Sequence, residues 1–340
     1  MFLFSLLISI NYEKFDAKLR FLVNITSVLF ITLFFGLKYN TGTDSVNYQR
    51  LYDLAIYIYD AYGEYYLRVP EVLYFGLNLF SALNDYSTVL IYMVCGFLIA
   101  ISTMYSAIYL KVNPFLLFVI IFPFHIVMMA ISGIRQGVSE SFVLLASAFI
   151  LNGNKKLAFL MIAIATGFHA SSLIFLSILF IDVKKRFLLI LVPCFFGASL
   201  ISGNSEYGHY VGSELFNAGI FMRVGFVLVL TLAIFLTIKC MTERTLLNPY
   251  SRWIYFSYCC FPALVLLGII NTTLADRVSY YFICILSLVY LFFKRKFGAP
   301  LFITPIMVLA SFVCLLAFLT FGNHADTYYY DSYIYHLFDN

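Results

Sequence analysis

The sequence predicts an all-α protein that crosses a membrane many times. Of its 340 residues, 63% are hydrophobic and only 11% are charged, a composition that excludes a soluble domain. The apolar residues gather in stretches close to the roughly 20 residues that a helix needs to cross a bilayer, and Lys and Arg cluster between them. We therefore expect about ten transmembrane helices and two partial segments in one integral membrane domain, residues 1–340.

Ten apolar stretches are the expected spans. The first is short, and it lacks the basic leader and small-residue cleavage site of a removable signal peptide. Two further apolar pieces, 70–83 and 157–182, do not fit ordinary crossings. The ten spans are 1–12, 19–37, 86–110, 114–131, 133–151, 187–202, 222–239, 252–270, 275–293 and 300–321.

Residues 157–182 are predicted to form a re-entrant hairpin. Lys155 and Lys156 precede the segment and a Lys-Lys-Arg cluster follows it, so a single crossing would leave one basic cluster on the outer side. A hairpin has limbs of about 12 residues that reach roughly 18 Å. Gly167 supplies the bend and His169 lies just past the tip. The alternative is a single crossing that leaves the Lys-Lys-Arg cluster on the outer side.

Three segments are expected outside: an outer loop at 38–69, a second at 203–221, and the tail 323–340. In the first loop, aromatic and apolar residues from Asn47 to Tyr62 repeat every three to four positions, which predicts a helix lying on the outer membrane surface. The second loop contains no Lys or Arg.

The positive-inside bias places most of the 21 basic residues on one side. These are Lys14, Lys18, Arg20, Lys111, Lys155, Lys156, Lys184, Lys185, Arg186, Lys239, Arg244, Arg252, Lys294, Arg295 and Lys296. The exceptions are Lys38, Arg50, Arg68, Arg135, Arg223 and Arg277. Because an arginine held at membrane depth usually has a functional partner, these exceptions indicate an anionic ligand on the outer face.

Arg135 and Arg277 each lie at the outer start of a predicted span. The first turn of a helix exposes unpaired N–H groups, and a guanidinium there suits phosphate or pyrophosphate. Gln136 adjoins Arg135, and Arg223 has a similar position with weaker surroundings. The alternatives are snorkelling to lipid headgroups and, for Arg277, a local ion pair with Asp276.

Three residues are candidates for a general base: His169, Asp44 and Glu71. His169 sits at the hairpin tip, and histidine suits proton transfer near neutral pH. Asp44 is otherwise an ordinary turn or helix cap, and Glu71 an acid at a helix N-terminus. Sequence alone does not rank them. His125 is expected only to hydrogen-bond within the bundle.

Other site chemistries lack their motifs. The outer side has no Asp-x-Asp pair, and the chain has no P-loop and no His/Cys cluster at zinc spacing. We therefore expect no metal, no cofactor and no disulfide framework. The net charge of +4 reflects the basic residues kept on one side of the membrane, so no nucleic-acid partner is expected. Any donor handled outside should be lipid-linked.

The ordered motifs resemble the EpsG/Wzy-type polysaccharide polymerases of bacterial surface-glycan pathways. They span most of the chain, and Lys38 stands where that family more often has arginine. The matching pieces are residues 38–44 with Asn47 and Tyr48, then Glu71, 133–137, 168–173, and Arg277 with Tyr281.

The resemblance implies a GT-C-like helical bundle in the bacterial inner membrane with its active site facing the periplasm. It would join oligosaccharide repeat units carried on undecaprenyl pyrophosphate, without a metal. Arg135, Arg277, Arg223 and Gln136 would bind pyrophosphate, and Tyr48, Tyr281 and Lys38 would contact substrate. The bilayer and a chain-length regulator are the further expected partners. A glycan ligase and a flippase for the same unit are the alternatives.

Overall fold

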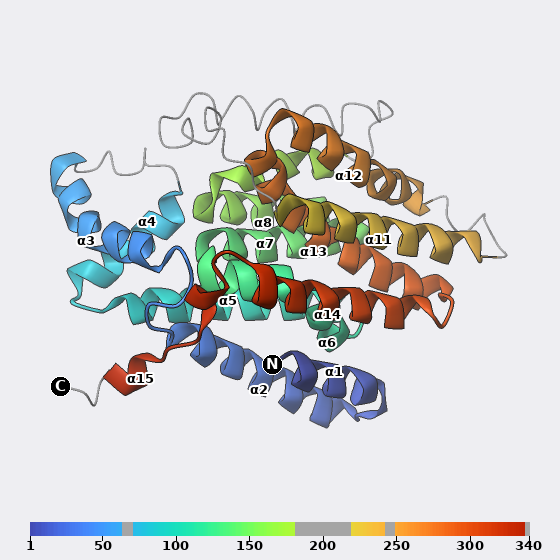
Figure 1. Ribbon diagram of the computed structural model, residues 1–340, viewed down its shortest axis with the longest axis horizontal. Helices are drawn as coiled ribbons and strands as arrows, with labels where there is room; N and C mark the ends of the chain where they lie inside the picture. Colours follow the sequence, from blue (N-terminus) through green and yellow to red (C-terminus); the bar gives the residue numbers. More distant parts are fainter. Residues whose placement is uncertain (63–70, 181–218, 242–248, 337–340) are drawn as a thin grey trace.

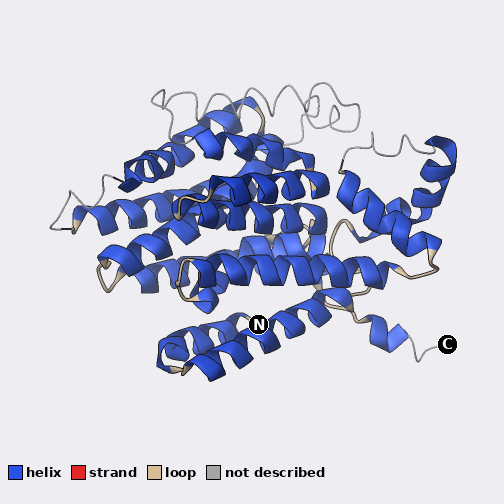
Figure 2. Ribbon diagram, turned by 180° about the vertical axis from the view of Figure 1, so that it is seen from behind, coloured by secondary structure: helices blue, strands red, loops and turns tan. Residues whose placement is uncertain are grey.

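The computed structural model describes residues 1–62, 71–180, 219–241 and 249–336. Within these ranges the regular structure is helical, apart from one isolated bridge between Lys38 and Ser332 (Figure 2). Among the described residues, eight helices are long and apolar enough to cross a membrane. They are α2 (Ala17–Gly36), α5 (Thr88–Tyr109), α6 with η3 (Pro114–Ser132), α7 (Ile134–Leu151), α11 (Gly219–Lys239), α12 (Ser251–Ile270), α13 (Thr272–Phe297) and α14 (Ile303–Phe321).

Two helices form the centre of the bundle. α7 and α13 are mostly buried and pack against each other, with α5 and α8 (Lys155–Phe168) on α7 and with α11 and α12 on α13. α2 packs on α5, and α14 contacts α11 and α6 (Figure 1). The predicted all-α polytopic membrane fold is confirmed.

Eight of the ten predicted spans correspond to the eight long helices. The predicted span 1–12 is instead α1 (Phe2–Asn11), a ten-residue helix that reaches about 15 Å and is too short to cross. The prediction of a crossing there is wrong because ten apolar residues cannot traverse the hydrocarbon core. The predicted span 187–202 lies outside the described residues.

The third long helix changes its winding halfway. Asn113 caps α6 (Pro114–Ile121) by accepting hydrogen bonds from the next two free amides at 3.1 Å. From Phe122 to Ser132 the chain continues as a π-helix, η3, whose wider turns are often found at functional sites. Gly133 then separates η3 from α7, so His125 and Ser132 are presented next to the first turns of α7.

The charged residues separate toward opposite ends of the bundle, as predicted. Arg20, Lys111, Lys294 and Arg295 line one cavity, and Lys296 contacts Tyr250 near the start of α12. At the other end, Arg135 lies in the first turn of α7, and Arg277 lies in the second turn of α13, where it bonds Gln136, the residue next to Arg135. We call the latter the outer end. Arg68 and the cluster 184–186 lie outside the described residues.

The outer loop contains the predicted surface helix. α3 (Ser45–Tyr62) packs on α4 (Val72–Leu83), where Ala55 contacts Phe75 and Leu79. Tyr48 is buried, whereas Tyr59 is 37% exposed. The predicted face is thus buried at Tyr48 and at Ala55, where α3 meets α4, but not at Tyr59. Residues 63–70 of this loop lie outside the described part.

The described part of the predicted hairpin reverses at His169. α8 ends at Phe168, His169 is extended, and η4 (Ala170–Phe180) follows as a 3₁₀ helix that packs against α8. A hydroxyl contact of 3.2 Å joins Thr166 to Ser172 across the turn. His169 therefore lies at the tip, as expected from the sequence, whereas Gly167, predicted to supply the bend, lies within α8.

The C-terminal tail lies along the loop that follows α2. The Tyr39 and Gly42 amides donate to the carbonyls of Asp331 and Thr327 at 2.9 and 2.7 Å, and the Tyr333 amide donates to Leu37 at 2.7 Å. The tail therefore shares the outer end with loop 38–69.

Gly42→Ala should destabilise the outer end. Gly42 has φ +94°, and a Cβ there would lie 2.9 Å from both the Ile131 oxygen and the Ser132 Cα. Gly153→Ala is the matched control, since Gly153 has φ +84° with no atom within 4 Å of the added Cβ. Both variants bear left-handed strain of roughly 1 kcal/mol, but only Gly42→Ala adds a clash. Thermal unfolding in detergent should show the larger drop for Gly42→Ala, and equal drops would contradict this packing.

Candidate active site at the outer end of the bundle

Arg135 is held at the start of α7 by an acid and two aromatic rings. Its Nη1 lies 2.5 Å from Oε2 of Glu71, and its guanidinium carbon lies 5.7 Å from the Tyr48 ring centroid and 5.5 Å from that of Tyr74. Burial raises the pKa of both tyrosines, so they stay neutral. The Arg135 side chain is still 30% exposed, which leaves part of a five-donor fork accessible.

Glu71 joins Arg135 to the tip of the hairpin. It precedes α4 in a left-handed conformation, φ 64°, and makes no side-chain cap hydrogen bond. Its other oxygen, Oε1, instead pairs with Nδ1 of His169. The carboxylate is buried, so these two partners offset the loss of its hydration. Three candidates from distant parts of the chain thus form one chain of contacts, His169–Glu71–Arg135.

Gln136 links Arg277 to α7. Its Nε2 donates to the Arg277 carbonyl at 3.0 Å and to Oε1 of Glu140 at 2.9 Å. Its Oε1 accepts from Nη1 of Arg277 at 3.0 Å. The outer ends of α7 and α13 are therefore level, and Arg277 bonds the residue next to Arg135.

Below Gln136 lies a buried polar network. Oε2 of Glu140 is 2.9 Å from Nδ1 of His125, whose Nε2 lies 3.2 Å from the Thr103 hydroxyl and 3.1 Å from that of Ser141. His125 thus hydrogen-bonds within the bundle, as predicted. One ligand atom each from His125, Glu140 and Cys284 lies within 4.8 Å of the other two, so this buried group has donors that a metal could use. The sequence spacing did not reveal it.

Arg223 and Asp276 form a buried ion pair between α11 and α13. The Arg223 guanidinium also lies 4.7 Å from the Tyr280 ring centroid, and Nη1 contacts the Met128 sulfur at 3.6 Å. Asp276, considered from sequence as a local partner of Arg277, thus pairs with a residue of α11. Arg223 is 5% exposed and neutralises Asp276 in the interior.

Asp44 lies on the neighbouring loop, against the end of η3. Its amide donates to the Ser132 hydroxyl at 3.3 Å, and the hydroxyls of Thr43 and Ser132 are 2.6 Å apart. Asp44 is close enough to Tyr48 and Tyr328 to contribute to their raised pKa values, to which burial contributes most.

Lys38 is buried directly after α2. Its Nζ donates to the Ile131 carbonyl and lies 4.6 Å from the Tyr92 ring centroid. Burial lowers its pKa to about 7. Lys38 thus ties α2 to the end of η3.

Tyr48 and Tyr281, predicted to contact substrate, are only 3% and 1% exposed. The Tyr281 hydroxyl donates to Ser139 on α7 at 3.1 Å and lies 3.0 Å from the Ser171 hydroxyl on η4. In the structure Tyr281 therefore fastens the hairpin to the two central helices.

A pocket of about 330 Å³ opens beside these residues. Its inner wall includes Lys38 and Tyr92, and the Tyr92 ring lies 6.3 Å from that of Tyr48. Tyrosines, hydroxyls, amides and one carboxylate make up most of the remaining lining, namely Tyr39, Asn40, Ser45, Gln49, Tyr52, Asp85, Tyr86, Ser87, Thr88 and Tyr333. Such a mixture of rings and hydrogen-bonding groups suits a hydroxyl-rich ligand.

A family model described as the EpsG family matches residues 21–335. The chain belongs to the EpsG family. Membership indicates a membrane protein of the polysaccharide polymerase type, in agreement with the resemblance found in the motifs. No curated protein and no solved structure matches the chain.

The stability of the protein should depend on pH through Lys38. Its folded pKa is about 7 and its ordinary value 10.5, so between these values the unfolded chain binds the proton that the folded chain has released. Stability should therefore rise with pH across this window, by up to about 1.4 kcal/mol per unit. Lys38→Met should reduce the rise.

Unfolding midpoints of wild type and variant at pH about 7 and about 9 test this. Lys156→Met, at an exposed lysine on α8, should keep the wild-type rise. A Lys38→Met protein that responds to pH as strongly as wild type would show that Lys38 keeps an ordinary pKa.

Proposed function

We propose that the protein polymerises oligosaccharide repeat units carried on undecaprenyl pyrophosphate, at the outer face of the bacterial inner membrane. An acceptor hydroxyl of one lipid-linked unit attacks the anomeric carbon of the growing chain. A new carbon–oxygen bond forms, the bond from the anomeric carbon to pyrophosphate breaks, and undecaprenyl pyrophosphate leaves. A protein base takes the hydroxyl proton.

The observation that carries this proposal is the placement of Arg135 and Arg277 on adjacent central helices, connected through Gln136. Guanidinium groups match phosphate oxygens, and fixed cations stabilise the charge that grows on a leaving pyrophosphate. Gln136 holds the Arg277 side chain in place. Arg223 instead keeps α11 and Asp276 in position.

His169 is the proposed base, with Glu71 as the residue that positions it. A carboxylate bonded to Nδ1 favours the tautomer in which that nitrogen carries the proton, so Nε2 is the basic atom. The same carboxylate holds Arg135. One acid would thus align the proton acceptor with a cation that binds the leaving group. Asp44 is the alternative base.

The outer pocket supplies room for sugars. Its size, about 330 Å³, falls within the roughly 300–1,000 Å³ of small-molecule sites. The Tyr92 ring in its lining packs against the Tyr48 ring, whose centroid lies 5.7 Å from the Arg135 guanidinium carbon. We assign it to sugar units of a lipid-linked substrate, with Lys38 at its inner wall.

Arg135→Ala and Arg277→Ala should each abolish long polymer while single repeat units remain on the lipid. Loss of one preorganised charge-stabilising group lowers a rate by roughly 10²–10³-fold. Gel analysis of the glycan from cells, or from purified protein with lipid-linked units, measures this. Arg50→Ala, at an exposed arginine on α3, is the control. Normal ladders from both variants at normal protein levels would exclude the assignment.

The same gel separates the rival functions. A ladder means a polymerase, and one new adduct on a different acceptor means a ligase. No covalent product with wild-type protein favours a flippase. Arg277→Ala is informative even if Arg135→Ala misfolds, because Arg277 lies on a different helix, α13, and is bonded to Gln136.

His169→Gln should slow polymerisation by roughly 10²–10⁴-fold, the usual contribution of a positioned base. Glu71→Gln should slow it less and shift the pH–rate profile, since Glu71 positions His169 and Arg135 rather than taking the proton itself. Asp44→Asn provides the comparison. If Asp44→Asn shows the greater fall and His169→Gln retains the wild-type pH profile, Asp44 is the base.

A further inference from the structure

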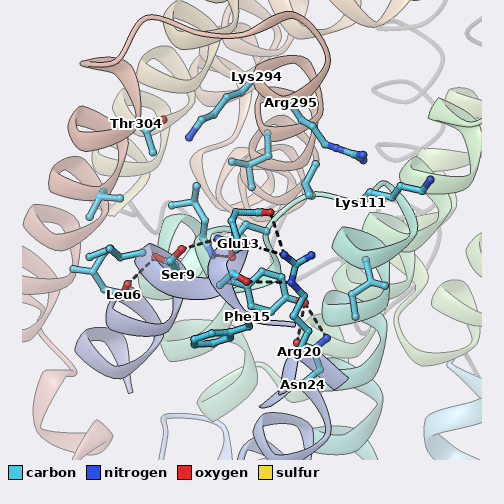
Figure 3. Close-up of a pocket in the computed structure, with 18 of the residues that line it drawn as sticks. Leu6, Ser9, Glu13, Phe15, Arg20, Asn24, Lys111, Lys294, Arg295 and Thr304 are labelled. Atoms are coloured by element: carbon cyan, nitrogen blue, oxygen red, sulfur yellow. Dashed lines mark hydrogen bonds and ion pairs between the residues drawn. The ribbon is translucent and has the colours of Figure 1, made fainter. Parts of the chain in front are cut away.

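A large cavity lies at the end of the bundle opposite the candidate active site. It encloses about 1500 Å³ between α1, α2, the α5–α6 connection and parts of α13 and α14 (Figure 3). Lys294 and Arg295 line it near the end of α13, whereas Arg277 lies at the start of that helix. The cavity and the candidate active site are therefore separate.

The walls of the cavity are largely apolar, and α1 forms one of them. The centroid of the Phe2 ring lies 5.4 Å from that of Phe122 and 5.6 Å from that of Phe312. The start of α1 therefore lies beside the middle of the α6–η3 helix and the middle of α14. From there α1 runs only ten residues toward the basic end. Leu3 and Phe21 of the walls are 67% and 66% exposed, which makes the cavity accessible from the bilayer.

Four cations and one carboxylate line the same cavity: Arg20, Lys111, Lys294, Arg295 and Glu13. Figure 3 shows them around its polar part, with Arg20 beside Glu13. Glu13 lies 3.9 Å from Arg20, so it offsets one charge and leaves a positive excess. Arg20 donates to the Tyr12 and Glu13 carbonyls at 3.1 and 2.7 Å, and Arg295 donates to the Leu110 carbonyl at 2.6 Å.

The positive-inside bias explains why basic residues occur at this end. It does not explain why four of them line one apolar cavity while Lys156 and Lys239 lie outside it. Basic pockets between helices on the cytoplasmic side bind anionic lipid headgroups. Apolar walls beneath a cationic rim complement a molecule with a phosphate and acyl chains.

We propose that this cavity binds an anionic glycerophospholipid of the cytoplasmic leaflet. Its phosphate lies among Lys111, Lys294 and Arg295, and its acyl chains lie along α1 and α14. The lipid fills the space that the short α1 leaves between α2 and α14. This proposal does not depend on the reaction proposed for the outer end.

Purified wild-type protein in detergent, titrated with phosphatidylglycerol, tests the site by native mass spectrometry and by thermal unfolding. Phosphatidylglycerol should remain bound and raise the unfolding midpoint more than phosphatidylcholine does. Lys111→Gln combined with Lys294→Gln should weaken phosphatidylglycerol binding roughly tenfold or more, since each cation near a lipid surface contributes to attraction. Lys156→Gln combined with Lys239→Gln is the matched control, because both are exposed lysines outside the cavity.

Three results would overturn the proposal. They are equal stabilisation by phosphatidylglycerol and phosphatidylcholine, equal loss in the control pair, and preference for undecaprenyl phosphate over phosphatidylglycerol. The last would identify the ligand as the carrier lipid. Size-exclusion chromatography of both double variants shows whether they remain folded. If the Lys111/Lys294 variant still polymerises normally, the function proposed for the outer end holds whatever the lipid-binding result.

Discussion

The amide of Gln136 sets the geometry of the outer end. It uses both kinds of hydrogen-bonding atom, donating to Glu140 and to the Arg277 backbone and accepting from the Arg277 side chain. An unpaired polar group at this depth is costly, so the three residues fix one another's positions. The register of α7 against α13 follows from this contact, and with it the common level of Arg135 and Arg277.

The second constraint is the charge of Glu71. This residue begins a short helix in the outer segment, and its two oxygens face residues that are 64 and 98 positions away in sequence. A buried carboxylate with only one of these partners would be poorly compensated. The charge of Glu71 therefore holds the hairpin tip, α4 and α7 together at the outer end. It also makes His169, the proposed base, a neighbour of Arg135.

Much of the fold could be predicted from sequence because hydropathy and Lys/Arg bias are local signals. Eight spans, the outer helix at 45–62 and the turn at His169 follow from them. The partners of polar residues could not be predicted from sequence, because a pair such as Arg223 and Asp276 depends on which helices pack together. The same limit applies to His125 and Glu140, whose contact depends on the π-helical winding of 122–132. The grouping of Arg135, Glu71 and His169 needed the structure, although each had been identified singly.

The path of the C-terminal tail has a practical consequence. Residues 327–333 hydrogen-bond to the loop after α2, beside Lys38 and the pocket assigned to sugars. A purification tag or fluorescent fusion attached at this end would crowd the surface beside the pocket that we assign to sugars. Loss of activity in such a fusion would then reflect obstruction rather than misfolding, and a handle at an exposed loop of the basic end, such as that around Gly153, avoids the problem.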